Sequence, residues 1–152
     1  MTILSLRPAG KEITYVLIKN DDAEKLTLLD QGALKLSKST SRTADIGELF
    51  KQLKKLIALH QVNFILIKAS VSTQDMNLAH LHTAEIRGIC VAAAMSTKTQ
   101  VKLISPAATF AQSGKVKETL KNDDLFARNI EGDLPKTKRD LALLTLNHLE
   151  KK

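Results

Sequence analysis

The sequence predicts an α/β fold in which a mixed sheet carries helices on both faces. Near the start of the chain, short apolar segments are separated by turn residues, as in antiparallel hairpins. Further along, two continuous apolar segments are each followed by a stretch with helical spacing, which is typical of parallel strands linked by helices. Together these patterns predict five strands, a three-strand antiparallel meander plus two parallel strands.

The meander is predicted in the first 36 residues. Residues 2–7 (TILSLR) and 11–20 (KEITYVLIKN) are predicted to form two strands, and the residues between them include a proline and a glycine that favour a tight turn. Residues 25–36 (KLTLLDQGALKL) alternate more weakly and predict a third strand, with a bulge or bend near Gly32.

Helices and parallel strands follow. Asp45 and Glu48 have the spacing of a capping box, so the first helix is expected to begin there. Its apolar residues recur at helical spacing: Ile46, Leu49, Phe50, Leu53, Leu56 and Ile57. Residues 62–68 (VNFILIK) predict a strand buried on both faces, and a second helix is expected from about Met76 to Met95.

The last third of the chain continues the alternation. Residues 100–105 (QVKLIS) predict another buried strand, after which Ser105 and Pro106 are suited to cap and begin a short helix. Residues 114–135 are mixed in charge and weakly periodic, so an irregular or partly helical segment is expected. A leucine-rich final helix is predicted from about Thr137.

Composition limits the class of protein. With 152 residues the chain is expected to form a single domain, residues 1–152, and its 43% hydrophobic and 26% charged content is ordinary for a soluble protein. No apolar run approaches the roughly 20 residues of a membrane span, and the start of the sequence lacks a secretory signal pattern. Cys90 is the only cysteine, which excludes an internal disulfide and favours a cytoplasmic location.

The net charge of +7 is compatible with a polyanionic partner such as DNA or RNA. Residues 35–55 supply +4 of this charge, because six cations outweigh two acids. These cations are Lys35, Lys38, Arg42, Lys51, Lys54 and Lys55. Aromatic residues make up only 3% of the chain, so contact with nucleic acid is expected through phosphates and not through base stacking. The alternative is that this run of cations is only a solvated helix face.

Four segments, in order, resemble the RuvC family of Holliday-junction resolvases, whose fold is ribonuclease H-like. Residues 3–18 (ILSLRPAGKEITYVLI) are similar to the family's first two strands, and residues 64–68 (FILIK) to a strand that normally ends in glutamate. Residues 84–94 (AEIRGICVAAA) resemble its small-residue helix and residues 138–149 (KRDLALLTLNHL) its last helix. Residues 103–107 (LISPA) are also similar to a bacterial RuvC-like family of unknown function.

This resemblance implies an active site that has degenerated. Such nucleases hold two divalent ions with four carboxylates. Here the first position is Arg7, the strand glutamate is Lys68 and the first acid of the last helix is Thr137, so only Asp140 keeps a carboxylate. Magnesium prefers carboxylate oxygens, and two cations would repel it. The sequence therefore predicts no bound metal, no other cofactor and no catalytic residue at these positions.

Two interpretations of the degenerate site remain open. Arg7 and Lys68 are expected to end adjacent parallel strands, with Asp140 paired to one of them, preferably to the forked guanidinium of Arg7. In the first interpretation the two cations attract a phosphate without cleaving it. In the second they form a solvated salt-bridge cluster left after function was lost.

Other candidate residues give weaker signals. His80 and His82 are two residues apart on a helix and point to different sides, which is poor geometry for a metal site. Cys90 lies among apolar residues and is interpreted as a core side chain and not as a nucleophile. Asp123 and Asp124 match no known pattern of metal ligands.

Three functions follow from these observations as hypotheses. The first is a nucleic-acid-binding or regulatory module that uses Arg7, Lys68 and the cations of residues 35–55. The second is a protein-interaction scaffold whose partners the sequence does not identify. The third is an active metal-dependent nuclease with a relocated site around Asp140. The family resemblance also implies a homodimer packed through the helix around Gly88.

Overall fold

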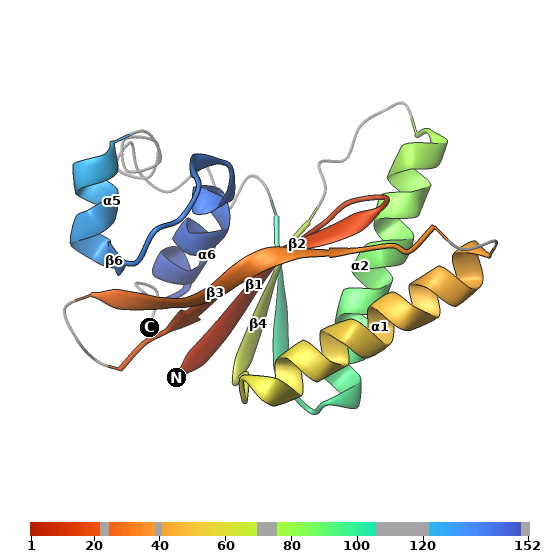
Figure 1. Ribbon diagram of the computed structural model, residues 1–152, viewed down its shortest axis with the longest axis horizontal. Coiled ribbons are helices and arrows are strands. Elements are labelled where there is room, and N and C mark those ends of the chain that lie inside the picture. Colours follow the sequence, from red (N-terminus) through yellow and green to blue (C-terminus); the bar gives the residue numbers. More distant parts are fainter. Residues whose placement is uncertain (22–24, 39–40, 70–75, 106–121, 150–152) are drawn as a thin grey trace.

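The computed structural model describes residues 1–21, 25–38, 41–69, 76–105 and 122–149. These residues form a six-stranded mixed sheet with helices on both faces (Figure 1). The elements are β1 (Thr2–Pro8), β2 (Glu12–Lys19), β3 (Leu26–Lys35), α1 (Arg42–Leu59), β4 (Phe64–Lys68), α2 (Leu78–Ser96), β5 (Gln100–Ile104), α5 (Asp123–Asn129), β6 (Ile130–Glu131), the 3-10 helix η1 (Lys136–Lys138) and α6 (Arg139–Leu149).

The strands lie in the order β5-β4-β1-β2-β3-β6. Strands β1, β2 and β3 form the predicted antiparallel meander. Strands β4 and β5 continue the sheet as parallel neighbours on the other side of β1. The predicted fold class is therefore confirmed. The predicted count of five strands was one too low, because the short strand β6 pairs in parallel with the beginning of β3.

The missed strand lies in the segment predicted to be irregular or partly helical. The described part of that segment contains helix α5, capped by Asn122, and then the two residues of β6. Ile130 and Glu131 pair with Leu26 and Thr27 of β3. A strand of two residues is too short to show a period of two, so its sequence carries no recognisable strand pattern.

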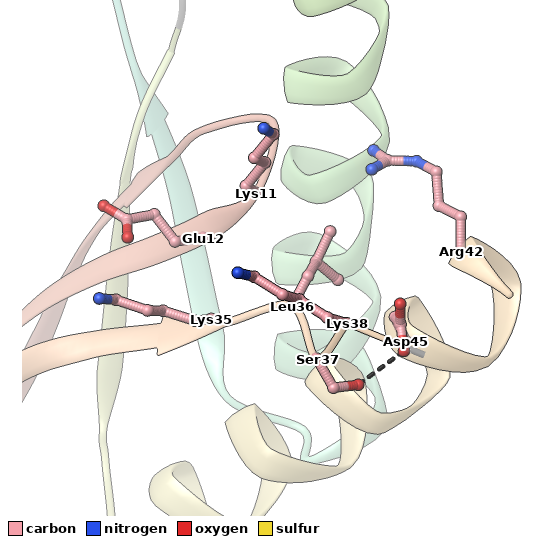
Figure 2. Close-up of a pocket in the computed structure, with 8 residues that line it drawn as sticks. All are labelled: Lys11, Glu12, Lys35, Leu36, Ser37, Lys38, Arg42 and Asp45. Carbon is pink, nitrogen blue, oxygen red and sulfur yellow. Dashed lines mark hydrogen bonds between the residues drawn. The ribbon is translucent and has the colours of Figure 1, made fainter. Parts of the chain in front are cut away.

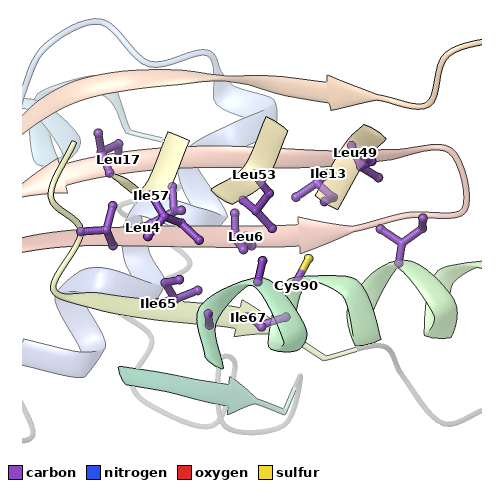
Figure 3. Packing of buried hydrophobic residues seen from close by; sticks show 14 residues of the cluster. Leu4, Leu6, Ile13, Leu17, Leu49, Leu53, Ile57, Ile65, Ile67 and Cys90 are labelled. Atoms are coloured by element: carbon purple, nitrogen blue, oxygen red, sulfur yellow. The ribbon is translucent and has the colours of Figure 1, made fainter. Parts of the chain in front are cut away.

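The sheet buries apolar side chains on both faces. Helices α1 and α2 cover one face and α5 and α6 the other (Figure 1). The core beneath α1 and α2 includes Leu4, Leu6, Ile13, Leu49, Leu53, Ile65, Ile67 and Cys90 (Figure 3). The core beneath α5 and α6 includes Ile3, Val16, Ile18, Leu66, Phe126, Leu141 and Leu144. Because successive side chains of a strand point to opposite faces, β1 and β4 each contribute apolar side chains to both cores.

Helix α1 begins one turn before the predicted cap. Its N-cap is Ser41, whose hydroxyl accepts a hydrogen bond from the amide of Ala44. Asp45, predicted as the cap, lies in the first turn, is buried and accepts a hydrogen bond of 2.6 Å from the hydroxyl of Ser37. The predicted capping box with Glu48 was therefore wrong, since Asp45 already lies inside the helix.

The irregularity in β3 also differs from its predicted position. Consecutive residues of β2 pair with Asp30 and Leu28, so the register shifts at Leu29 and not at Gly32. Gly32 stands opposite Tyr15, and a Cβ there would lie 2.9 Å from the Tyr15 hydroxyl oxygen. The glycine is therefore explained by the aromatic ring that packs against it and not by a bulge.

Strand β5 was predicted to be buried, and this was wrong within the described part of the chain. It is an edge strand there, with Lys102 exposed and Leu103 52% exposed. The short helix predicted from Ser105 and Pro106 lies outside the described residues. None of the described helices is long and apolar enough to cross a membrane.

Candidate functional site

The two cations at the ends of the parallel strands point toward helix α6. On β1, Ser5 faces this helix, and its hydroxyl oxygen lies 3.0 Å from that of Thr145. Arg7 comes two residues later and so points to the same face, at the end of the strand. Lys68 holds the same relation to Leu66 on β4, whose side chain belongs to the core beneath α6. The alternation of the strands thus directs both cations to one place.

Asp140, in the first turn of α6, lies between these cations. Nη1 of Arg7 donates to Oδ1 at 3.1 Å and to Oδ2 at 3.2 Å, and Nζ of Lys68 donates to Oδ2 at 2.6 Å. Nη1 of Arg7 also donates to the carbonyl of Thr137 in η1, at 3.1 Å. The sequence predicted one partner for Asp140, whereas the structure places both cations on its carboxylate.

Arg7, Lys68 and Asp140 are called the Asp140 cluster below. Their side chains are 35%, 20% and 18% exposed, so the cluster is partly buried but accessible from solvent. Within these three residues two cations share one carboxylate, so their formal charges sum to +1. Salt screens a partly buried charge less than one on an open surface, so the cluster is suited to attract an anion.

The six predicted basic residues divide into two groups. Lys35, Lys38 and Arg42 line a pocket together with Lys11 (Figure 2), and these four residues are called the pocket group. The helix group, Lys51, Lys54 and Lys55, lies further along α1 and does not line this pocket. Nζ of Lys54 lies 5.4 Å from the centre of the Phe50 ring.

Sequence reasoning missed Lys11 because the residue lies far from the basic run along the chain. The β2–β3 hairpin brings it close, since Glu12 pairs with Lys35 and the carbonyl of Lys11 accepts a hydrogen bond from the amide of Leu36. The predicted pairing of β2 with β3 was the signal that could have identified Lys11. In an antiparallel pair, the residue before the start of one strand lies beside the residue after the end of the other.

The weaker candidates have structural roles. The side chain of His80 accepts a hydrogen bond from the Asn77 amide and so takes part in the N-terminal cap of α2. Cys90 is fully buried, and burial raises the pKa of its thiol to about 12, as expected for a core residue. Asp123 pairs with Arg139 at 2.7 Å and with Lys136, and these cations lower the pKa of its carboxyl.

Comparison with known proteins supports the family assignment. The sequence model described as crossover junction endodeoxyribonuclease RuvC matches residues 3–119. This chain belongs to the RuvC family. Among curated proteins, none matches its sequence.

Solved structures of a RuvC protein and of a Holliday junction resolvase share the fold of this chain. Thermus thermophilus RuvC, in complex with Holliday junction substrate, is 12% identical with a TM-score of 0.73, and the match covers 99% of this chain and 96% of that one. The yeast mitochondrial Holliday junction resolvase is 15% identical with a TM-score of 0.66, and the match covers 95% of this chain and 76% of that one. At these identities the likeness shows a common ribonuclease H-like fold.

The residues of the Asp140 cluster do not fit the two divalent ions that membership of the RuvC family implies. Arg7 and Lys68 stand where the family resemblance predicts two metal ligands, and both donate to Asp140, the one acid that the resemblance retains. A metal ion would have to displace both cations from Asp140 and then remain beside them. Within the described ranges, no group of three or more histidine, cysteine or acidic side chains is arranged to hold a metal ion.

Proposed function

We propose that this RuvC-family protein binds nucleic acid through phosphates and does not cleave it. The observation that carries this proposal is the double engagement of Asp140, whose carboxylate accepts hydrogen bonds from Arg7 at 3.1 Å and from Lys68 at 2.6 Å. A carboxylate neutralised in this way is a poor ligand for magnesium, whereas the two cations keep an excess positive charge that suits a phosphate.

The arrangement of the cluster favours binding over catalysis. Asp140 and the carbonyl of Thr137 hold the guanidinium of Arg7 in place, so a phosphate would meet donors that are already oriented. Preorganised donors lose less conformational entropy on binding than free surface side chains. The net charge of +7 adds a long-range attraction for polyanions. Branched DNA is the first ligand to test, because the Thermus thermophilus relative was solved with a Holliday junction substrate.

We expect salt-sensitive binding without cleavage. Fluorescence anisotropy would compare branched DNA, duplex, single strand and RNA at two salt concentrations, and matched samples with magnesium would be checked for cut strands. Binding should weaken with a log–log slope of roughly −0.9 for each phosphate contacted in duplex DNA. Magnesium-dependent cleavage that disappears in Asp140→Asn would contradict the proposal and support a nuclease site around Asp140.

We also propose that two copies pack through α2 as a homodimer. Leu81, Gly88 and Met95 are seven residues apart, so they lie on one stripe of the helix, and all three are exposed. Leu81 is 48% and Met95 66% exposed, which is unusual for large apolar side chains that share a helix face. A Cβ at Gly88 would meet no atom within 4 Å, so space remains beside the helix for close approach of a partner.

Replacing Leu81 and Met95 by glutamate is expected to convert a dimer into a monomer, because two charges per copy would be buried in the shared interface. Sedimentation velocity would measure the association state of both proteins. Leu29→Glu is the control, since Leu29 is exposed on β3, away from α2. A wild-type protein that stays monomeric, or a double variant that stays dimeric, would contradict packing through this stripe.

A further inference from the structure

A second cationic site lies at the same end of the sheet as the Asp140 cluster. It is a pocket of about 510 Å³ between the β1–β2 turn, the end of β3 and the start of α1 (Figure 2). The four cations of the pocket group line it, together with Glu12, Leu36, Ser37 and Asp45. Lys11, Lys35 and Lys38 are exposed, so the pocket is reached from solvent.

The acids near this pocket leave a positive balance. Asp45 is only 7% exposed, and its carboxylate accepts the Ser37 hydroxyl. Glu85 accepts from Nε and Nη2 of Arg42 at 2.9 and 2.7 Å and so balances that guanidinium. Within the described ranges, no ion pair engages the lysines of the pocket group. Three lysines thus face Glu12 and the already hydrogen-bonded Asp45.

Arg42 gives the pocket a fixed wall. Besides its two bonds to Glu85 on α2, it donates from Nη1 to the carbonyl of Gly10 in the β1–β2 turn, at 3.3 Å. A Cβ at Gly10 would lie 3.2 Å from Cβ of His82 on α2, so the turn itself packs closely on that helix. These contacts join the turn, α1 and α2 and hold the pocket in shape. The flexible side chains of the lysines then place ammonium groups around this fixed wall.

The pocket and the Asp140 cluster lie within reach of one nucleic acid. Both are at the end of the sheet where β1, β3 and β4 terminate and β2 begins. They lie on opposite faces, since helices α1 and α2 flank the pocket whereas α6 flanks the cluster. From β4 to β3 there are three strand spacings, or about 15 Å. A DNA strand presents a phosphate every 3.4 Å or so along the helix axis, so one duplex can span both sites.

We propose that this pocket binds a backbone phosphate of the nucleic acid whose other phosphates contact the Asp140 cluster. The proposal deepens the nucleic-acid-binding function proposed above and rests on it. An ammonium group offers three donors and no acceptor, so three lysines around the pocket suit the charged oxygens of a phosphate better than a neutral ligand of similar size. The nucleic-acid backbone would thereby be contacted on both faces of the sheet, at the end where β1, β3 and β4 terminate.

The first experiment compares two triple variants that remove the same charge. Lys11→Gln, Lys35→Gln and Lys38→Gln change the pocket group, and Lys51→Gln, Lys54→Gln and Lys55→Gln change the helix group. In anisotropy titrations with duplex DNA, the pocket variant should lose about tenfold in affinity at low salt, and its log–log salt slope should become shallower by about one. The helix variant should stay within about threefold of wild type. Equal losses in both variants, or a pocket variant within twofold of wild type, would overturn the proposal.

A second measurement separates failure of the pocket from failure of the proposed function. Inorganic pyrophosphate is titrated into isotopically labelled protein while backbone amide signals are followed by NMR. Signals of Leu36, Ser37 and Arg42 should shift in wild type and in the helix variant but not in the pocket variant. If DNA binds but pyrophosphate leaves these signals unmoved, the pocket proposal is wrong and the proposed function stands. If DNA does not bind at all, the proposed function fails and this assignment of the pocket to a nucleic-acid phosphate fails with it.

Discussion

The double substitution Arg7→Asp with Lys68→Glu is expected to abolish salt-sensitive DNA binding and to make stability depend on a divalent cation. The change removes both cations of the Asp140 cluster and places three carboxylates where hydrogen bonds of 2.6 to 3.2 Å now hold the cluster together. Without a cation these carboxylates repel one another, and we expect the free energy of unfolding to fall by about 2–4 kcal/mol.

Thermal unfolding with and without manganese would measure this dependence. A metal ion at 100 times its dissociation constant stabilises the folded state by about 2.7 kcal/mol, so the midpoint of the double variant should rise clearly while that of wild type stays fixed. The control is Lys51→Glu with Lys54→Glu, which makes the same change in net charge on the helix group. A double variant that binds DNA as wild type does and ignores manganese would show that the Asp140 cluster is a residual salt bridge.

The convergence of this cluster could be predicted from the sequence because it depends on backbone geometry. Arg7 and Lys68 each end a strand whose alternation is fixed by buried neighbours, and parallel strands end at the same edge of a sheet. The double engagement of Asp140 could not be predicted in the same way. It depends on where the first turn of α6 lies relative to the ends of β1 and β4. The preceding helix η1 helps to fix that position, because the carbonyl of its Thr137 accepts a hydrogen bond from Arg7.

Predictions that depended on local patterns alone were less secure. Asp45 and Glu48 have capping-box spacing, but Ser41 caps the helix one turn earlier. The carboxylate of Asp45 instead accepts a hydrogen bond from the Ser37 hydroxyl. The apolar run of β5 suggested burial on both faces, whereas strand order in the described chain makes it an edge, and sequence does not state strand order. Lys11 was missed for the same reason, because hairpin pairing and not sequence spacing brings it to Lys35.

Asp140→Asn is expected to lower stability and to raise DNA affinity, two effects of opposite sign. The carboxamide keeps the shape of the carboxylate but loses its charge, so Arg7 and Lys68 would repel each other across it. Loss of charge-assisted hydrogen bonds in a partly buried site should cost about 1–3 kcal/mol of unfolding free energy. The same change gives the cluster a second uncompensated positive charge, so the affinity for duplex DNA should rise several-fold and its salt slope should steepen.

Urea unfolding and anisotropy on the same samples would measure both effects. The matched control is Asp21→Asn, which removes the same charge from a surface pair with Lys19 at the opposite end of the sheet, where the Asp21 side chain is 51% exposed. Surface pairs contribute little, so this control should unfold as wild type does. Equal gains in affinity for both variants would assign the effect to net charge. Lower stability without a gain in affinity would identify the Asp140 cluster as structural, because a phosphate bound beside Arg7 and Lys68 should bind more tightly once the neighbouring negative charge is removed.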